Sequence, residues 1–207
     1  NFFLAGVYDR QRRPLDAERH YEIVVDNAPH SRLRVDAQKK LALLRGYKNM
    51  YSGNSAAAIK HFEDALKVDP KNVPALMGLA SVHYEQRDID KAIEVYEKVV
   101  EIHPQHLDAH FRLATAYLDK NRFVDGIRKM DLVVANSAGT PTQQTALQIL
   151  ESASKRLDLA KVRSMIRKED GYLARLRANP ADLNAMMGLA DGYIEQNRID
   201  EAEKFPA

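Results

Sequence analysis

The chain has 207 residues, a net charge of +2 and no cysteine. This length is enough for one large domain, and the missing cysteines exclude disulfide and thiol chemistry. The balanced charge excludes a global attraction to nucleic acid or membranes, and no apolar run approaches the length of a membrane-spanning helix.

Small residues recur along the chain in a constant setting, and they mark an internal repeat. The steps between them are 41, 34, 34, 34 and 42 residues. The residues concerned are Ala17, Ala58, Ala92, Gly126, Ala160 and Ala202. A unit of 34 residues fits a helix–turn–helix, which buries its apolar face only by stacking on its neighbours. The spacing therefore predicts an all-α solenoid.

The first two units cover residues 1–30 and 31–71, and prolines at Pro29 and Pro70 mark their ends. The second unit is seven residues longer than the repeat. Its extra residues continue a helical stripe through Leu33, Ala37 and Leu41. We therefore expect a first helix with two added turns.

The central units, 72–105 and 106–140, carry the repeat most clearly. The first of them reads LMGLASVHYEQRDIDKAIEVYEKVVEIHP from Leu76. Ala80 and Ala92 are small enough for two helices to approach closely, and Tyr96 fills the space beside them. These units are predicted to be the best packed.

The unit at 141–180 is degenerate and extended. It keeps Leu147 and Ala160, but Ser164 stands where a large aromatic residue is expected. Eight extra residues before Pro180 again predict a long helix.

The last unit, 181–207, is partial. Residues 185–202 share ten of eighteen residues with 75–92, but Pro206 follows Ala202 by four residues and is expected to stop the second helix early. The apolar residues Met186, Leu189 and Tyr193 are then left without a covering helix. Self-association through this unit is a possible consequence.

These motifs resemble the tetratricopeptide repeat family, in which an aromatic, Leu-Gly, Tyr, Ala-x3-Phe and Pro recur every 34 residues. The resemblance covers nearly the whole chain and implies one right-handed superhelical solenoid over residues 1–207, of about five units. The chain opens with Asn1 inside a helical pattern. We therefore expect it to be an excised part of a longer protein.

In this family the first helix of each unit lines a concave groove that binds a peptide or helix. The resemblance assigns apolar, aromatic and methionine residues to that groove, with Glu85, Asp119 and Glu195 at its edge. The groove positions are Phe2, Leu43, Tyr47, Met50, Met77, Ser81, Tyr84, Phe111, Thr115, Leu118, Met187 and Ile194. The alternative interpretation is that single members only pack between neighbouring first helices.

One subset of the family grips the terminal carboxylate of chaperones with Lys and Asn on its first helices. The matching positions here are Leu43, Met77 and Phe111, which cannot form hydrogen bonds to a carboxylate. The sequence therefore argues against that binding mode.

Catalytic and cofactor motifs are weak. No glycine-rich phosphate loop occurs. His103, His106 and His110 have spacings that zinc accepts, but they span a repeat junction and lack further ligands, so a packing role is favoured. We expect no enzyme activity, cofactor or metal.

Eight Lys and Arg residues between 155 and 177 form a basic helix. It lacks interleaved aromatic residues apart from Tyr172, which favours a solvated face or a patch for an acidic partner over nucleic acid.

The sequence thus predicts a non-catalytic scaffold or adaptor that binds an unidentified protein or peptide. Two alternatives remain open. One is a substrate-recruiting segment of a larger enzyme, and the other is an oligomerisation module.

Overall fold

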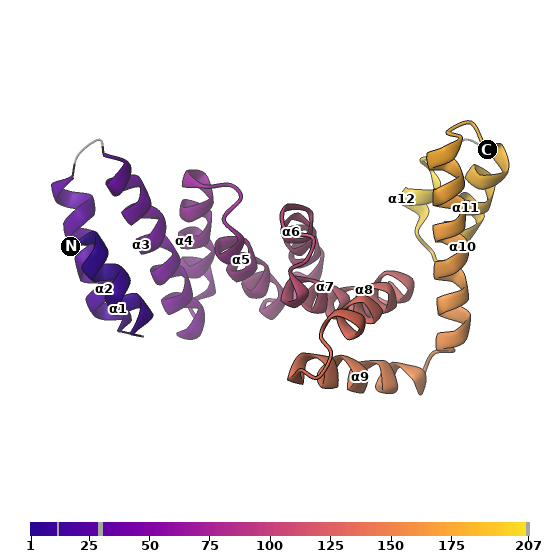
Figure 1. Cartoon of the computed structure of the whole chain (residues 1–207), viewed down its shortest axis with the longest axis horizontal. Helices are drawn as coiled ribbons and strands as arrows, with labels where there is room; N and C mark the ends of the chain where they lie inside the picture. The colour runs from indigo at the N-terminus through magenta and orange to yellow at the C-terminus, as the bar shows by residue number, and fades with distance from the viewer. Residues whose placement is uncertain (12, 29–30, 206–207) are drawn as a thin grey trace. The chain divides into compact units, whose positions relative to one another are not determined.

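The computed structural model describes every residue except 12, 29–30 and 206–207, and within this part of the chain it is all-α (Figure 1). It divides into two compact bodies, residues 1–109 and 110–207. We call them the N-terminal and C-terminal bodies and describe each by itself. The expectation of a single solenoid across both stays a prediction.

Helices follow one another as antiparallel pairs, most of them 13 or 14 residues long. Their bounds are α1 (Phe2–Arg10), α2 (Pro14–Asn27), α3 (Arg32–Tyr51), α4 (Ser55–Val68), α5 (Val73–Glu85), α6 (Ile89–Ile102), α7 (Leu107–Asp119), α8 (Phe123–Asn136), α9 (Pro141–Ser154), α10 (Leu159–Ala178), α11 (Leu183–Glu195) and α12 (Ile199–Ala202). The two helices predicted to be long, α3 and α10, have 20 residues each.

Side-chain caps start many of these helices. Asn54, Asn72 and Asp182 each accept a hydrogen bond from the backbone N–H three residues on. Such caps satisfy N–H groups that have no partner inside the helix. Capping also lowers the pKa of the Asp182 carboxyl group. The hydrogen bond from the Ala185 N–H has the larger effect and those from Arg175 the smaller one.

Four of the turns inside the pairs share one backbone feature. Gly53, Arg87, Asn121 and Asn197 all have positive φ, between 56° and 73°, and each directly precedes the residue that caps a second helix. A left-handed residue at this point reverses the chain within a few residues. The four turns therefore place their helix pairs in the same local geometry.

Glycines permit close approach of large rings in the N-terminal body. Phe62 of α4 is fully buried. A β-carbon on Gly46 would lie 2.6 Å from its ring, and one on Gly78 would lie 2.3 Å from it. The ring therefore fills the space between α3 and α5, which are the first helices of consecutive units.

The degenerate unit differs from its predicted register. Ala160, expected in a tight helix contact, is exposed, and Leu147 is 48% exposed. Tyr172 instead takes the role of the large aromatic residue, because a β-carbon on Gly188 would lie 2.4 Å from its ring. The placement of Ala160 in the repeat register was therefore wrong.

The helix α10 contributes to two apolar clusters within the C-terminal body. Val162, in its first half, packs with Ala146 and Leu150 of α9 and with residues of α8. Tyr172 and Leu176, in its second half, pack against Leu189 and Tyr193 of α11. In Figure 1, α9 meets α10 at one end, while α11 lies along the other half.

Candidate functional site

The predicted groove positions of the N-terminal body centre on Tyr47. Its hydroxyl donates a hydrogen bond to the Pro74 carbonyl oxygen at 2.8 Å, which links α3 to the start of α5. Its ring meets Phe62 edge to face, with centroids 5.1 Å apart. A Tyr held at both ends is a rigid contact surface that loses little conformational entropy on binding.

Tyr51 lies beside Tyr47 and was missing from the predicted set. Its ring stacks on Tyr47 at a centroid distance of 6.3 Å, and its side chain is 81% exposed. The spacing of four residues already indicated that both lie on one helix face. We call Tyr47, Met50 and Tyr51 the aromatic platform.

The other predicted positions of the N-terminal body are less available. Phe2, Leu43, Met50 and Tyr84 are half-buried. Met77 is only 9% exposed and belongs to the core. Its assignment as a groove contact therefore finds no support in the structure.

The two predicted groove residues with aliphatic hydroxyl groups, Ser81 and Thr115, both have hydrogen-bond partners inside the protein. Ser81 Oγ lies 3.2 Å from the Tyr96 hydroxyl, and Thr115 Oγ1 donates to the Phe111 carbonyl at 3.0 Å. Phe111 and Leu118, on the same helix as Thr115, are half-buried against the core of the C-terminal body. This part of the predicted groove is thus mainly packing surface.

Met187 and Ile194, the last predicted positions, are open to solvent. They are 58% and 57% exposed, and Ile199 beside them is 46% exposed. With other residues of α11 and α12 they line an apolar cleft of about 600 Å³. In contrast, Leu189 and Tyr193, which were expected to lack cover, are buried against α10 and Phe205.

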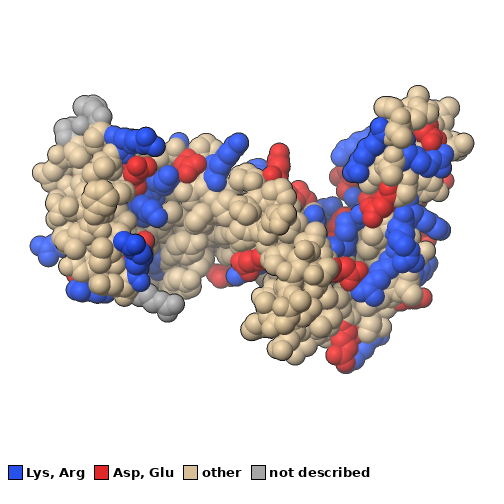
Figure 2. Space-filling view, in the orientation of Figure 1, with Lys and Arg blue, Asp and Glu red and all other residues tan. Residues whose placement is uncertain are grey.

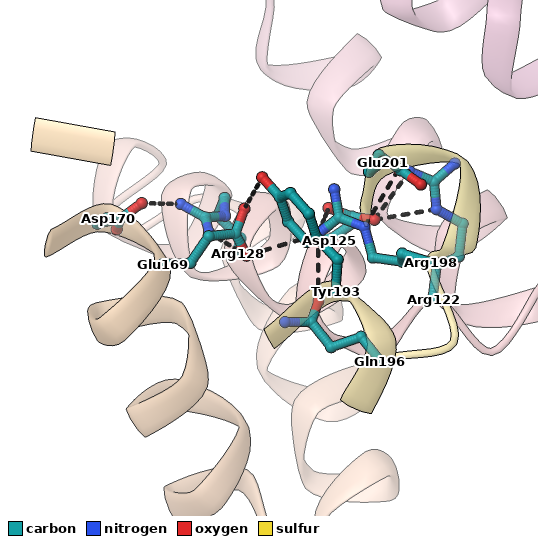
Figure 3. A network of polar contacts seen from close by, with 9 residues as sticks. All are labelled: Arg122, Asp125, Arg128, Glu169, Asp170, Tyr193, Gln196, Arg198 and Glu201. Atoms are coloured by element: carbon teal, nitrogen blue, oxygen red, sulfur yellow. Dashed lines mark hydrogen bonds and ion pairs between the residues drawn. The ribbon is translucent and has the colours of Figure 1, made fainter. Parts of the chain in front are cut away.

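A network of charged groups joins α8, α10, α11 and α12 inside the C-terminal body (Figure 3). Arg198 is its centre, with a side chain only 12% exposed. It lies 3.5 Å from Asp125, 3.5 Å from Glu169 and 3.2 Å from Glu201. Its guanidinium also covers the Tyr193 ring at 4.4 Å.

The same network contains two further arginines of α8 and its cap. Arg122 lies 2.9 Å from Asp125, and Arg128 lies 3.2 Å from Glu169 and also pairs with Asp170. Burial and the nearby Glu169 raise the pKa of Tyr193, so its hydroxyl stays protonated. No local sequence pattern indicates this network, because its members come from four helices.

The basic residues of α10 differ in their partners. Figure 2 shows Lys and Arg side chains gathered along this helix. Arg163 makes two hydrogen bonds to Asp131, and Arg175 makes two to Asp182. Part of the predicted basic patch is therefore paired within the protein.

The described residues contain no metal-binding cluster and no membrane-spanning helix. His106 Nδ1 accepts a hydrogen bond from the Ala109 N–H, so it caps α7. His110 is buried, at 3% exposure. Over the described ranges, no group of His, Cys, Asp and Glu has metal-ligand geometry, and no helix has the length and apolar character to cross a bilayer.

Consecutive antiparallel helix pairs with these turns and close contacts are characteristic of helical repeat proteins. Two profiles described as "Tetratricopeptide repeat" match residues 43–106 and 83–150, which together make up half of the chain. The chain belongs to the tetratricopeptide repeat family.

Curated relatives are distant and much longer. Superkiller protein 3 of Saccharomyces cerevisiae is 24% identical over 49% of this chain and 7% of its own length. Human DnaJ homolog subfamily C member 7 is 27% identical over 56% of this chain and 25% of its own length. The UDP-N-acetylglucosamine–peptide N-acetylglucosaminyltransferase of Caenorhabditis elegans is 27% identical over 38% of this chain and 7% of its own length. The chain thus spans a quarter or less of each.

Solved structures agree in fold. A tetratricopeptide repeat protein from Parabacteroides merdae matches 97% of this chain and 73% of its own, with a TM-score of 0.57 and 18% identity. The first TPR of Spaghetti (RPAP3), bound to the HSP90 peptide SRMEEVD, matches 57% of this chain and 94% of its own, with a TM-score of 0.53 and 15% identity. At this identity the likeness concerns the fold alone.

Proposed function

We propose that this chain is a non-catalytic protein-interaction module that binds an apolar peptide or helix of a partner on the face formed by the first helices of its N-terminal body. The observation that carries this proposal is the aromatic platform. Tyr47 is fixed by Pro74 and Phe62, and it supports the exposed ring of Tyr51. Rigid, exposed Tyr side chains are typical binding hot spots.

The occupant is an apolar segment rather than a terminal carboxylate. Leu43 and Met50 of α3 place no N–H donor on the predicted contact face. Glu85, at the predicted edge in the same body, is exposed and acidic. An acidic tail would therefore be repelled, whereas an apolar segment with flanking Lys or Arg fits.

The test is affinity capture followed by mass spectrometry, with three forms of the protein. Tyr51→Ser combined with Met50→Ser removes exposed apolar surface from the platform. The matched control is Leu15→Ser on α2, a second helix, where the side chain is 68% exposed. We expect the double variant to lose partners that both the wild type and the control retain.

A defined peptide tests the rejected binding mode. The HSP90 peptide SRMEEVD, added at millimolar concentration, is expected to cause no chemical-shift change at the platform. Retention of all partners by the platform variant, or saturable binding of SRMEEVD there, would overturn the proposal.

Self-association is a second candidate function, favoured by the exposed apolar cleft of α11 and α12. We expect light scattering to show concentration-dependent association, and Ile194→Asp to abolish it. Leu183→Asp, which changes a 66% exposed residue outside the cleft lining, is the control. A monomer at millimolar concentration, unaffected by either change, would exclude this function.

A further inference from the structure

The helices α3, α4 and α5 of the N-terminal body show how a first helix, a second helix and the next first helix pack together. In the N-terminal body, α3 contacts both α4 and α5. Phe62, eight residues before Pro70, lies against Gly78 of α5. Tyr172, eight residues before Pro180, lies in the same way against Gly188 of α11. Therefore α10 and α11 correspond to α4 and α5.

The place that corresponds to α3 is a cleft in the C-terminal body. It has a volume of about 260 Å³ and is lined by residues of α10 and α11 and the turn after α11. No residue of α9 is part of its described lining; α9 and the first half of α10 instead contribute Leu150 and Val162 to one core cluster. We call it the α10–α11 cleft.

Residues at equivalent positions confirm that a covering helix is absent from this cleft in the described chain. Val82 of α5 is fully buried, but its counterpart in the internal repeat is Gly192, and a β-carbon there would have nothing within 4 Å. Ala92 of α6 is fully buried, and Lys168 takes the corresponding place, four residues before Tyr172, and is exposed. Both sides of the cleft thus expose positions whose counterparts in the N-terminal body are fully buried.

Exposed charges of opposite sign run along the two edges, and the remaining charged residue of the α10 lining, Glu169, is buried in ion pairs with Arg128 and Arg198. Lys161 and Lys168, seven residues apart, line the α10 edge, while Asp191 and Glu195, four residues apart, line the α11 edge. These spacings place each pair on one helix face. At one end Lys161 Nζ lies 3.9 Å from Glu195 Oε1. Both side chains of that pair are more than 60% exposed, so opening it costs little.

We propose that the α10–α11 cleft binds an amphipathic helix of a partner protein, which takes the position that α3 has in its own unit. Its apolar face, rich in small residues, lies over Met165, Tyr172 and Gly192. Its carboxylates face Lys161 and Lys168, and its Lys or Arg side chains face α11. Helices placed in grooves in this manner are a recurring mode of recognition.

The probe is a synthetic helical peptide with Ala and Leu on one face, Glu along one edge and Lys along the other. Two control peptides have the same apolar face but only Glu, or only Lys, on both edges. We expect the mixed peptide to bind at least tenfold more tightly than either control by calorimetry, with NMR shifts at the Gly188 and Gly192 amides. Equal binding of the three peptides, or no shift at these glycines, would overturn the proposal.

Variants of two open helical glycines locate the site. Gly192→Leu fills the cleft, and Gly171→Leu places the same side chain on α10 outside the lining, where a β-carbon also has nothing within 4 Å. We expect at least a tenfold loss of peptide binding for Gly192→Leu and unchanged binding for Gly171→Leu, with equal helicity by circular dichroism.

Reversing one charge at the edge of the cleft tests the proposed charge recognition without changing the packing inside the cleft. Lys168→Glu is expected to weaken the mixed peptide and to strengthen the all-Lys peptide. The Tyr51→Ser and Met50→Ser double variant should bind the mixed peptide normally, which separates this site from the aromatic platform. Unchanged binding by Gly192→Leu or Lys168→Glu would refute the assignment.

Discussion

The ring of Tyr172 occupies the space that a side chain on Gly188 would need, since a β-carbon there would lie 2.4 Å from the ring. Phe62 and Gly78 have the same relationship at 2.3 Å. In both cases an aromatic residue of a second helix meets a glycine of the next first helix. The contact between consecutive units therefore depends on a missing methyl group.

Gly188→Ala is expected to lower the free energy of unfolding by about 1–3 kcal/mol, because the added methyl overpacks the contact with Tyr172. Gly192→Ala, on the same helix, is the control. Its β-carbon meets open space, so removing a helical glycine should stabilise the protein by up to about 1 kcal/mol. Urea unfolding measures both; equal effects of the two changes would contradict the contact.

Ala92→Leu should destabilise the protein by about 1–3 kcal/mol or more, because Ala92 is fully buried between helices. Ala160→Leu should change the stability by less than about 0.5 kcal/mol, as is usual at exposed positions. Thermal unfolding compares the two. A large loss with Ala160→Leu would restore the register that the spacing of small residues predicts.

Arg198→Met should cost about 3–5 kcal/mol, because Asp125 and Glu169 keep their charges in a buried setting without this partner. Combining it with Glu169→Leu should recover part of the loss, which a double-mutant cycle measures. Strictly additive effects would show that the two side chains do not interact.

Acid should weaken the contact between α2 and α3. Burial opposes ionisation of Glu18, but hydrogen bonds from Arg45 and Lys48 outweigh it and lower the pKa of the carboxyl below 4.5. The unfolded chain then binds the proton more readily, so this stabilisation is complete above pH 4.5 and is lost as the pH falls through the lowered pKa.

Glu18→Gln should flatten the stability profile below pH 4.5 and leave less stability at neutral pH. The control Glu63→Gln changes an exposed carboxylate that forms no ion pair with Arg45 or Lys48. Urea unfolding between pH 3 and 7 gives the comparison, and identical slopes for wild type and Glu18→Gln would refute the assignment.

Much of the fold follows from the sequence, because helix pairs, their turns and the long helices α3 and α10 are local patterns. The position of Ala160 shows where this reasoning ends. Eight added residues exceed two helical turns by about one residue, so apolar positions still recur on a broad helix face wherever they are inserted. Only the spacing from Tyr172 to Pro180, equal to that from Phe62 to Pro70, locates the insertion before Tyr172.

The predicted groove was less well defined by the sequence. A residue on the inner face of a first helix is buried in the core where neighbouring helices pack closely around it. Where they do not, the residue is exposed and can contact a partner. Met77 is buried, while Met187 at the equivalent position is exposed. The charged network around Arg198 was not predictable either, because it depends on four helices meeting in space.

The attachment of α12 has a mechanical consequence. This helix has four residues, of which only Ala202 is buried, yet Arg198 before it and Glu201 within it are tied to α8 by ion pairs. A pulling force on the C-terminal segment is therefore resisted by these ion pairs as well as by the apolar cluster that contains Ala202 and Phe205. Because the arginine at the centre of the ion pairs is only 12% exposed, dissolved salt screens them little, so such an attachment yields abruptly under load at low and at high ionic strength.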